Sequence, residues 1–253
     1  MTEIFDYHAH YDDEQFDGDR EETLLRVHRS GVEAILNAGS DLDSSRASVA
    51  LAERFPFVYA TAGVHPHAAH TAPGDYLAQL EALAAHPRVV ALGEMGLDYY
   101  YTKEHKEAQL RVFEEQLALA VRLGLPVVIH DRDAHQDTLD LLTRYRPAGA
   151  VHCYSGSAQM ARQLLDLGLY IGFTGAVTFK NARRAVEAAA VVPLDRLLTE
   201  TDCPYIAPEP HRGRRCDSSL LPHTITVLAG IKGIDPQEMA RVGNRNARRL
   251  FGL

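Results

Sequence analysis

Cysteines and long apolar runs are scarce in this chain. Its 253 residues include three cysteines, Cys153, Cys203 and Cys216, an odd number with no Cys-x-x-Cys spacing. A disulfide framework or a structural zinc knuckle is therefore not expected, and a reducing compartment fits best. No apolar run approaches the roughly eighteen residues of a membrane span, and no basic segment precedes an apolar one near the start. We expect a cytoplasmic protein that does not contact membranes.

Positive charge is also in deficit. Lysine and arginine number 26 against 34 aspartates and glutamates, which gives a formal net charge of -8 and a pI near 5.9. This balance argues against a protein that coats nucleic acid by charge alone, so a polyanionic substrate must be held locally. No low-complexity tract, linker or composition shift divides the chain. We expect residues 1–253 to form a single domain and, with nothing to predict an oligomer, a monomer.

Short apolar runs alternate with amphipathic stretches along the whole chain. The runs that are typical of strands cover residues 3–8, 33–39, 58–64, 89–94, 126–130, 150–153, 170–175 and 197–202. Strand and helix alternating in this way over about 250 residues predict an α/β fold, the (β/α)8 TIM barrel. An open doubly wound sheet is the alternative. It would need a glycine-rich phosphate turn after the first strand, where the chain has HAHYDD.

Three helices carry clear signals at their ends. The most amphipathic stretch, KEAQLRVFEEQLALAVRLG, is expected to stop at Gly124. Asp19 is expected to cap a helix, with Glu22 three residues later completing a capping box. Asp235 followed by Pro236 is typical of a helix start and predicts the last helix.

Two histidines stand close together near the start of the chain. The stretch FDYHAHY places His8 and His10 two residues apart in the first strand. Residues two apart in a strand share one face, so their ring nitrogens can converge. Two neutral imidazoles at one point indicate a metal ion. A pair taken alone is more often two hydrogen-bonded polar residues. Whether His8 and His10 bind a metal therefore depends on whether other strands carry further ligands at equivalent places.

Polar residues of metal-binding type end several other apolar strands. In a barrel of this kind the active site lies at the carboxyl ends of the strands, where such residues converge in one mouth. Loop hydrogen bonding explains any one of them, but six residues from five strands are hard to explain in that way. The expected ligands are His8, His10, Glu94, His130, His152 and Asp202.

These ligands exceed the number that one tetrahedral zinc ion needs. We therefore expect two divalent ions, magnesium, manganese or zinc, that share a bridging carboxylate, for which Glu94 is the natural candidate. A water activated by such ions can attack a phosphoryl or an acyl centre, with Asp202 as the candidate general base. One ion would be held by His8, His10 and Asp202, and the other by His130 and His152.

The motifs together resemble a known family. DYHAH, GVHPH, GEMGLDYY, VVIHDRDA, VHCYSGS and LLTETDCPY, followed by NARRLFG, resemble the TatD family of metal-dependent DNases among the amidohydrolase-like barrels, from about residue 4 to Leu253. The resemblance implies a barrel with one to three metal ions and a magnesium- or manganese-supported deoxyribonuclease, often acting 3′ to 5′. The family's ligand positions fall on the six residues named above. The segment RCDSSLL and Cys203 depart from the family pattern and put substrate preference in doubt.

Residues for binding the substrate are less sharply indicated. His65 resembles a family position near the substrate. Arg132 could hold a phosphate oxygen with its guanidinium, or pair with a neighbouring aspartate. Tyr154 and Ser155 follow His152 in a turn that opens a helix, so their backbone amides could bind a phosphate.

Weaker signals surround these residues. Glu200 shares a face with Asp202 and could order a metal ligand or pair within the barrel. One of the tyrosines at 99–101 could stack a base, whereas packing is the expected role of the others. The arginines of HRGRR are either a local positive rim or simply solvated.

Three functions agree with these observations. The first is a metal-dependent phosphodiesterase that acts on DNA ends, and the second is an amide, ester or lactone hydrolase with the same ions. The third is a barrel that binds without catalysis, which the complete ligand set disfavours. We expect the first, a deoxyribonuclease acting on DNA or a small phosphodiester.

Overall fold

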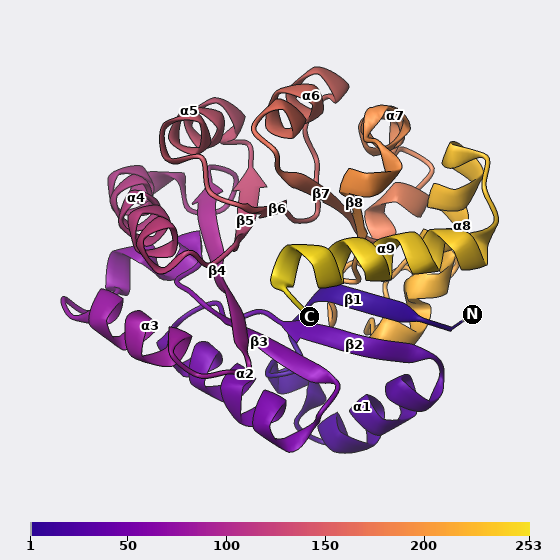
Figure 1. The fold of residues 1–253 in the computed structure, drawn as a ribbon, viewed down its shortest axis with the longest axis horizontal. Coiled ribbons are helices and arrows are strands. Elements are labelled where there is room, and N and C mark those ends of the chain that lie inside the picture. The colour runs from indigo at the N-terminus through magenta and orange to yellow at the C-terminus, as the bar shows by residue number, and fades with distance from the viewer. Residues whose placement is uncertain (1) are drawn as a thin grey trace.

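The computed structural model describes residues 2–253, which form a barrel of parallel strands inside a ring of helices (Figure 1). The strands follow one another around the sheet in chain order, each parallel to its neighbour. They are β1 (Ile4–Ala9), β2 (Val32–Asn37), β3 (Val58–Ala62), β4 (Val89–Asp98), β5 (Val127–Arg132), β6 (Gly149–Val151), β7 (Tyr170–Phe173) and β8 (Leu197–Thr199). The (β/α)8 barrel and its eight predicted strands are confirmed.

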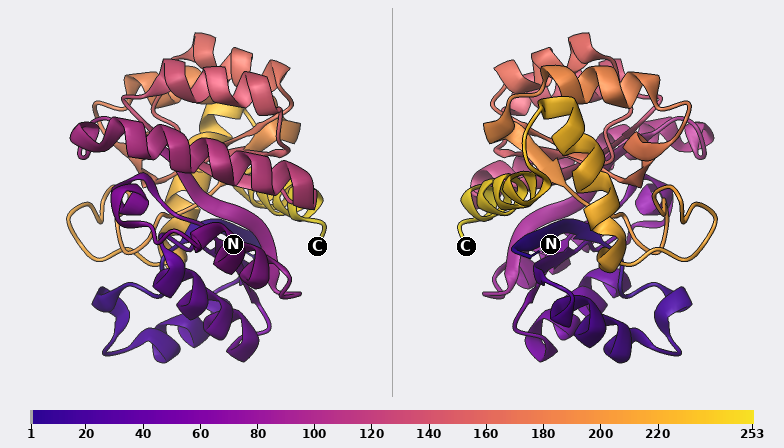
Figure 2. Two further views of the ribbon diagram at one scale, coloured as in Figure 1. Left: turned by 90° about the vertical axis from the view of Figure 1, so that its left-hand side faces the viewer. Right: turned by 90° about the vertical axis from the view of Figure 1, so that its right-hand side faces the viewer.

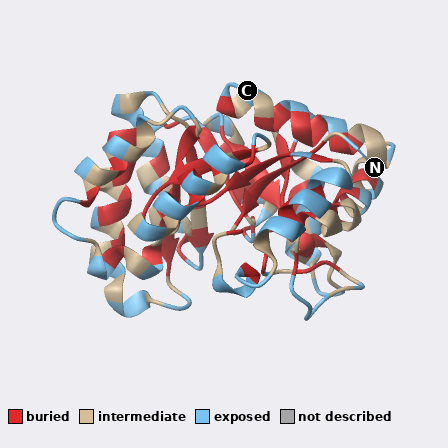
Figure 3. Ribbon diagram, turned by 90° about the horizontal axis from the view of Figure 1, so that it is seen from below, coloured by how far each residue is buried: buried red, intermediate tan, exposed pale blue. Residues whose placement is uncertain are grey.

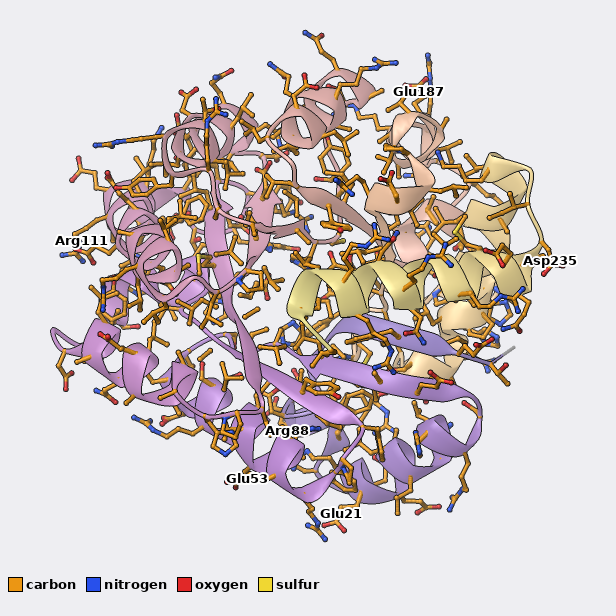
Figure 4. All side chains as sticks on the ribbon, viewed as in Figure 1. Glu21, Glu53, Arg88, Arg111, Glu187 and Asp235 are labelled. Carbon is orange, nitrogen blue, oxygen red and sulfur yellow. The ribbon has the colours of Figure 1, made fainter. Side chains whose placement is uncertain are left out.

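The helices cover the outside of the barrel. Figure 3 shows the buried strands at the centre and exposed residues on the outer helix faces, and side chains such as those of Arg111 and Glu187 point away from the barrel in Figure 4. No helix of residues 2–253 is long and apolar enough to span a membrane. The helices are α1 (Arg20–Arg29), α2 (Leu42–Arg54), α3 (Tyr76–Ala84), α4 (Lys106–Leu123), α5 (His135–Tyr145), α6 (Ala158–Asp166), α7 (Arg183–Val191), α8 (Leu221–Lys232) and α9 (Pro236–Phe251).

The helix ends follow the sequence signals in two cases out of three. Gly124 takes the left-handed conformation, with φ of 68°, directly after α4. Asp235 caps α9 by accepting hydrogen bonds from the amides of the second and third helical residues. Asp19 does precede α1, but its carboxylate binds Arg215 at 2.6 and 2.7 Å instead of capping the helix. The predicted capping box is therefore wrong, because an arginine from a distant loop competes for the carboxylate.

Strand β4 is longer than expected. The sequence pattern predicts its end at Glu94, whereas the strand continues to Asp98 and keeps pairing with β5. Gly96 allows this continuation: its φ is +148°, and a Cβ there would lie 1.9 Å from the carbonyl oxygen of His130. The extension of the strand brings Asp98 close to the same cluster of side chains as Glu94.

The barrel closes just beyond β8. The amide of Asp202 donates to the carbonyl of His8 at 3.0 Å, and the amide of His10 donates to the carbonyl of Cys203 at 2.7 Å. These two bonds bring Asp202 next to the two histidines of β1. Closure of the barrel therefore brings together candidate ligands from opposite ends of the chain.

The amino-terminal half of the barrel interior is apolar. Phe5, Tyr7, Leu36 and Leu198 are buried there and pack in one cluster. Helix α9 lies across β1 (Figure 1), and its Phe251 ring lies 6.4 Å from the rings of both Phe5 and Tyr7. A packed apolar floor thus lies beneath the polar carboxyl ends of the strands.

Candidate metal centre

The first half of the centre joins β1, β4 and the segment after β8. Nε2 of His8 and Nε2 of His10 face each other at 3.1 Å. Oε2 of Glu94 lies 3.4 Å from the first nitrogen and 3.5 Å from the second. Oδ1 of Asp202 lies 3.7 and 3.4 Å from the same two nitrogens. Four atoms with lone pairs therefore converge on one point, as a divalent ion requires.

The second half of the centre uses the other oxygen of the same glutamate. Oε1 of Glu94 lies 2.9 Å from Nδ1 of His130 and 2.8 Å from Nε2 of His152. Those two ring nitrogens are 3.2 Å apart, and Nε2 of His65 approaches Oε1 of Glu94 at 3.5 Å. The structure thus brings all six expected ligands together and adds His65 at their edge. Glu94 lies between the two groups with one oxygen facing each.

Charge compensates for the burial of this carboxylate. The side chain of Glu94 is only 4% exposed. Burial alone would raise the pKa of Glu94, but the neighbouring imidazoles, led by His152 and His65, hold it well below the usual range. Glu94 and Asp202 are therefore ionised at neutral pH, since the pKa of Asp202 is also lowered, against its burial, by His10 and its neighbours.

Two oxygen atoms behind the centre are hydrogen-bonded to its imidazoles, and a third, from a carboxylate, lies near another imidazole. The carbonyl of Ala38 lies 3.1 Å from Nδ1 of His10, and Oδ2 of Asp98 lies 3.2 Å from Nε2 of His130. Oε2 of Glu200 lies 3.4 Å from Nδ1 of His152. Each leaves the other ring nitrogen directed at the centre, as in known metal sites. The role considered for Glu200 agrees with this contact.

Asp98 is the residue that sequence reasoning missed. The predicted strand stopped at Glu94, so the carboxylate four residues later was assigned no role. The available signal was the motif GEMGLDYY itself, in which Asp98 ends the strand that carries Glu94. Its Oδ1 also accepts from the amides of Tyr100 and Tyr101 at 2.9 and 2.7 Å. Asp98 thereby links His130 to the turn that follows β4.

A cavity of about 450 Å³ opens above the ligands. Arg132, at the end of β5, lines it together with His65, Asp98 and Tyr101. The Arg132 guanidinium lies 4.5 and 4.8 Å from the ring centres of Tyr100 and Tyr101. Within residues 2–253 no carboxylate forms an ion pair with Arg132, so the alternative of pairing with an adjacent aspartate is not realised. Its charge is available at the mouth.

The other two residues expected to bind substrate lie elsewhere. Tyr154 is buried, its amide donates to the carbonyl of Gly172 at 3.0 Å, and its hydroxyl donates to the carbonyl of Ser157 at 2.7 Å. Both donors of Tyr154 are therefore already used, and this half of the predicted phosphate cradle is wrong. Ser155 is exposed but does not line the cavity, and its role stays a prediction.

Comparison with known proteins gives consistent results. A family model described as TatD related DNase matches residues 5–252. A protein of Bacillus subtilis named uncharacterized metal-dependent hydrolase YabD is 40% identical over 253 residues, covering 99% of both chains. A protein of Cronobacter sakazakii named 3′-5′ ssDNA/RNA exonuclease TatD is 40% identical over 259 residues, covering 98% of this chain and 97% of its own. A crystal structure of YJJV, a TatD homolog from Escherichia coli, superposes with a TM-score of 0.94 at 32% identity, over 99% and 98% of the two chains.

Proposed function

Because the chain belongs to the family of TatD-related DNases, we propose that this metal-dependent hydrolase removes nucleotides from the 3′ ends of single-stranded DNA or RNA. The single observation that carries the proposal is the placement of Glu94, whose two oxygens face two separate groups of ligand atoms. Phosphodiester hydrolysis by two ions needs the ions about 3.5 to 4 Å apart, and a carboxylate with one oxygen facing each group suits that spacing. The names of the relatives support the polarity and the single-stranded substrate.

The donor set fits a pair of divalent ions. Bound there, the ions would supply Lewis acidity at the phosphoryl oxygens and lower the pKa of a water. Imidazoles suit zinc, whereas carboxylates suit manganese and magnesium; because this donor set mixes the two kinds of ligand, we rank zinc and manganese ahead of magnesium, which binds mainly oxygen. One site comprises His8, His10, Asp202 and an oxygen of Glu94, and the other comprises His130, His152 and the second oxygen of Glu94.

Asp202 is positioned to accept the proton of the attacking water. Its carboxylate lines the cavity with 13% of the side chain exposed, so it reaches both the ligands and the solvent. The lowered pKa of Asp202 keeps it ionised, as a general base must be at neutral pH. Its fixed place beside His8 and His10 follows from the backbone bonds that close the barrel.

Arg132 is positioned to contact the phosphate that is cleaved. It lines the same cavity, carries no competing carboxylate among the described residues, and is held against two aromatic rings. A guanidinium can meet two phosphate oxygens at once and stabilise the charge that grows on them. The Tyr100 and Tyr101 side chains are 59% and 66% exposed, so a nucleobase can reach them for stacking.

The three thiols support the expected location in the cytoplasm. Cys153, Cys203 and Cys216 are all free. Free cysteines in a large chain are typical of a reducing compartment. We therefore retain the cytoplasm as the proposed location.

The proposal is tested with 5′-labelled single-stranded DNA and RNA, incubated with chelator-treated protein to which manganese, magnesium or zinc is returned. We expect stepwise shortening from the 3′ end that needs added metal. Hydrolysis that survives thorough chelation would refute the metal mechanism. A panel of esters and lactones in parallel reveals the alternative chemistry: turnover of these compounds without any cleavage of nucleic acid would replace the nuclease proposal with an acyl hydrolase.

A further inference from the structure

A second cavity lies beside the catalytic one, in the loop between β8 and the 3-10 helix η6 (Ser218–Leu220). It measures about 350 Å³ and is lined mainly by residues 204–207 and 212–215 of that loop, with Gln15 and Phe179. Figure 2 shows this loop extending away from the barrel in both views. None of the ligand residues lines this second cavity. It is therefore a separate feature of the mouth that the hydrolytic centre does not explain.

The two cavities are neighbours that share a wall. Tyr205 and Ile206 line both of them. The Tyr205 side chain is 49% exposed, its hydroxyl donates to Asp13 at 2.6 Å, and its ring lies 6.4 Å from the ring of His10. An extended ligand that fills the catalytic cavity would reach the second one by passing this tyrosine.

Unneutralised positive charge distinguishes the second cavity. Arg212 and Arg214 are exposed, and within residues 2–253 neither forms an ion pair with a carboxylate. Arg215, the third arginine of the lining, is by contrast bound to Asp19 by two hydrogen bonds. The guanidinium of Arg212 lies 4.2 Å from the ring centre of Phe179, which holds its position. Two cations thus stand free in a protein whose formal net charge is -8.

The loop that carries these arginines is built to hold its shape. The amide of Cys216 donates to the carbonyl of Pro204 at 2.9 Å and ties the two ends of the loop together. The amide of Glu209 donates to Oγ1 of Thr178 at 2.8 Å. Gly175 completes the docking, because a Cβ there would lie 2.3 Å from the carbonyl oxygen of Ile206. An anchored loop loses little entropy when it binds, so its arginines are preorganised.

We propose that the second cavity binds the backbone phosphate of a nucleotide next to the one being hydrolysed, with Arg212 and Arg214 as its ligands. The inference rests on the proposed function and extends it: the protein would grip a strand across two subsites divided by Tyr205. Free guanidinium groups are suited to phosphate oxygens, and a single strand is flexible enough to bend around the dividing ring. The contact makes polynucleotides better substrates than isolated phosphodiesters.

The test compares two double variants that lose the same charge. Arg212→Ala/Arg214→Ala removes the proposed phosphate ligands, whereas Arg245→Ala/Arg249→Ala removes two exposed arginines of α9, which packs on the apolar floor of the barrel. Binding of a fluorescent single-stranded oligonucleotide is followed by anisotropy in chelator, so that no hydrolysis occurs. Hydrolysis of the oligonucleotide and of bis(p-nitrophenyl) phosphate is then measured with manganese.

We expect the loop variant to bind the oligonucleotide about tenfold more weakly, whereas the α9 variant binds like the parent. The slope of log affinity against log salt should fall in magnitude by about 0.7, the contribution of the one phosphate contact to a single strand that the variant loses. With metal, the KM for the oligonucleotide should rise while turnover of the small diester stays unchanged. Equal binding by the two variants, or a parallel loss on both substrates, would overturn the second subsite. Failure of the parent protein to cleave any nucleic acid would instead overturn the proposed function.

Discussion

The two ends of the barrel are built from the same strands, yet they differ in kind. At the amino-terminal end, β1 and β8 contribute Phe5, Tyr7 and Leu198, which pack under Phe251 of α9. A few residues further along the same segments the chain supplies His8 and Asp202 to the polar centre. The floor is a packed apolar core that stabilises the fold, while the mouth holds buried carboxylates and imidazoles that face one another. Substitutions at the two ends should therefore affect different measurements.

The strongest expected effect belongs to the mouth. Glu94→Gln keeps the shape of the side chain but removes the charge that both ligand groups share. Loss of a residue that only hydrogen-bonds to a metal ligand already lowers metal affinity or activity by about 10- to 100-fold. Loss of the shared carboxylate should therefore lower turnover of single-stranded DNA by more than about a hundredfold, and the metal content should fall with it. The check is plasma emission analysis of bound manganese beside the nuclease assay. Glu53→Gln, on the exposed side of α2, is the matched control and should lose neither.

Substitutions in the apolar floor should lower the free energy of unfolding and leave metal binding unchanged. Phe251→Ala deletes a ring that is 6% exposed and packs against Phe5 and Tyr7, so the free energy of unfolding should drop by about 3 to 5 kcal/mol. Leu253→Ala, two residues further on and 37% exposed, should change it by less than about 0.5 kcal/mol. Urea titrations measure both. If Phe251→Ala lost metal at a temperature where it is still folded, the separation of the two ends would not hold.

Substitution of Arg132 should affect phosphodiester substrates and neutral esters differently. Arg132→Ala should cost about 2 to 4 kcal/mol of transition-state stabilisation on a phosphodiester, and much less on a neutral ester. Arg132→Lys should recover only part, because it keeps the charge but loses the planar fork. The measurement is the ratio of nuclease to esterase turnover with metal occupancy checked. An unchanged ratio would remove Arg132 as a phosphate ligand and favour the acyl hydrolase.

The last prediction concerns a buried carboxyl group of β1. Asp6 is fully buried and accepts hydrogen bonds from the amide and the hydroxyl of Thr201, and burial raises its pKa to about 7. The folded state therefore keeps a proton that the unfolded chain releases near pH 4, so the contribution of Asp6 to stability falls as the pH rises from about 4 to about 7.

Asp6→Asn cannot titrate and should lack this change. The difference in unfolding free energy between the parent and the variant should shift by about 4 kcal/mol across that range, since each pKa unit corresponds to about 1.4 kcal/mol. Chemical denaturation at several pH values in chelator measures it. A difference that does not vary with pH would contradict the raised pKa.

Much of this architecture could be predicted from the sequence, because it depends on local pattern. Apolar runs predicted the eight strands, and polar residues near their carboxyl ends predicted six side chains that converge at one point. Asp98 could not be predicted in the same way, because β4 continues through Gly96 only by virtue of a close backbone approach to β5. The ion pair of Asp19 with Arg215 and the hydrogen bond from the amide of Tyr154 to the carbonyl of Gly172 likewise join segments that are distant in the sequence. Contacts of this kind are decided by tertiary packing, which local periodicity does not contain.

The sharing of one carboxylate by two ions is tested most directly by anomalous diffraction from crystals soaked in manganese, recorded near the manganese absorption edge. The account predicts two peaks on either side of the Glu94 carboxylate, one beside His8, His10 and Asp202 and one beside His130 and His152. Manganese peaks that lie away from all six residues, or a single peak touching only one oxygen of Glu94 at saturating metal, would contradict it.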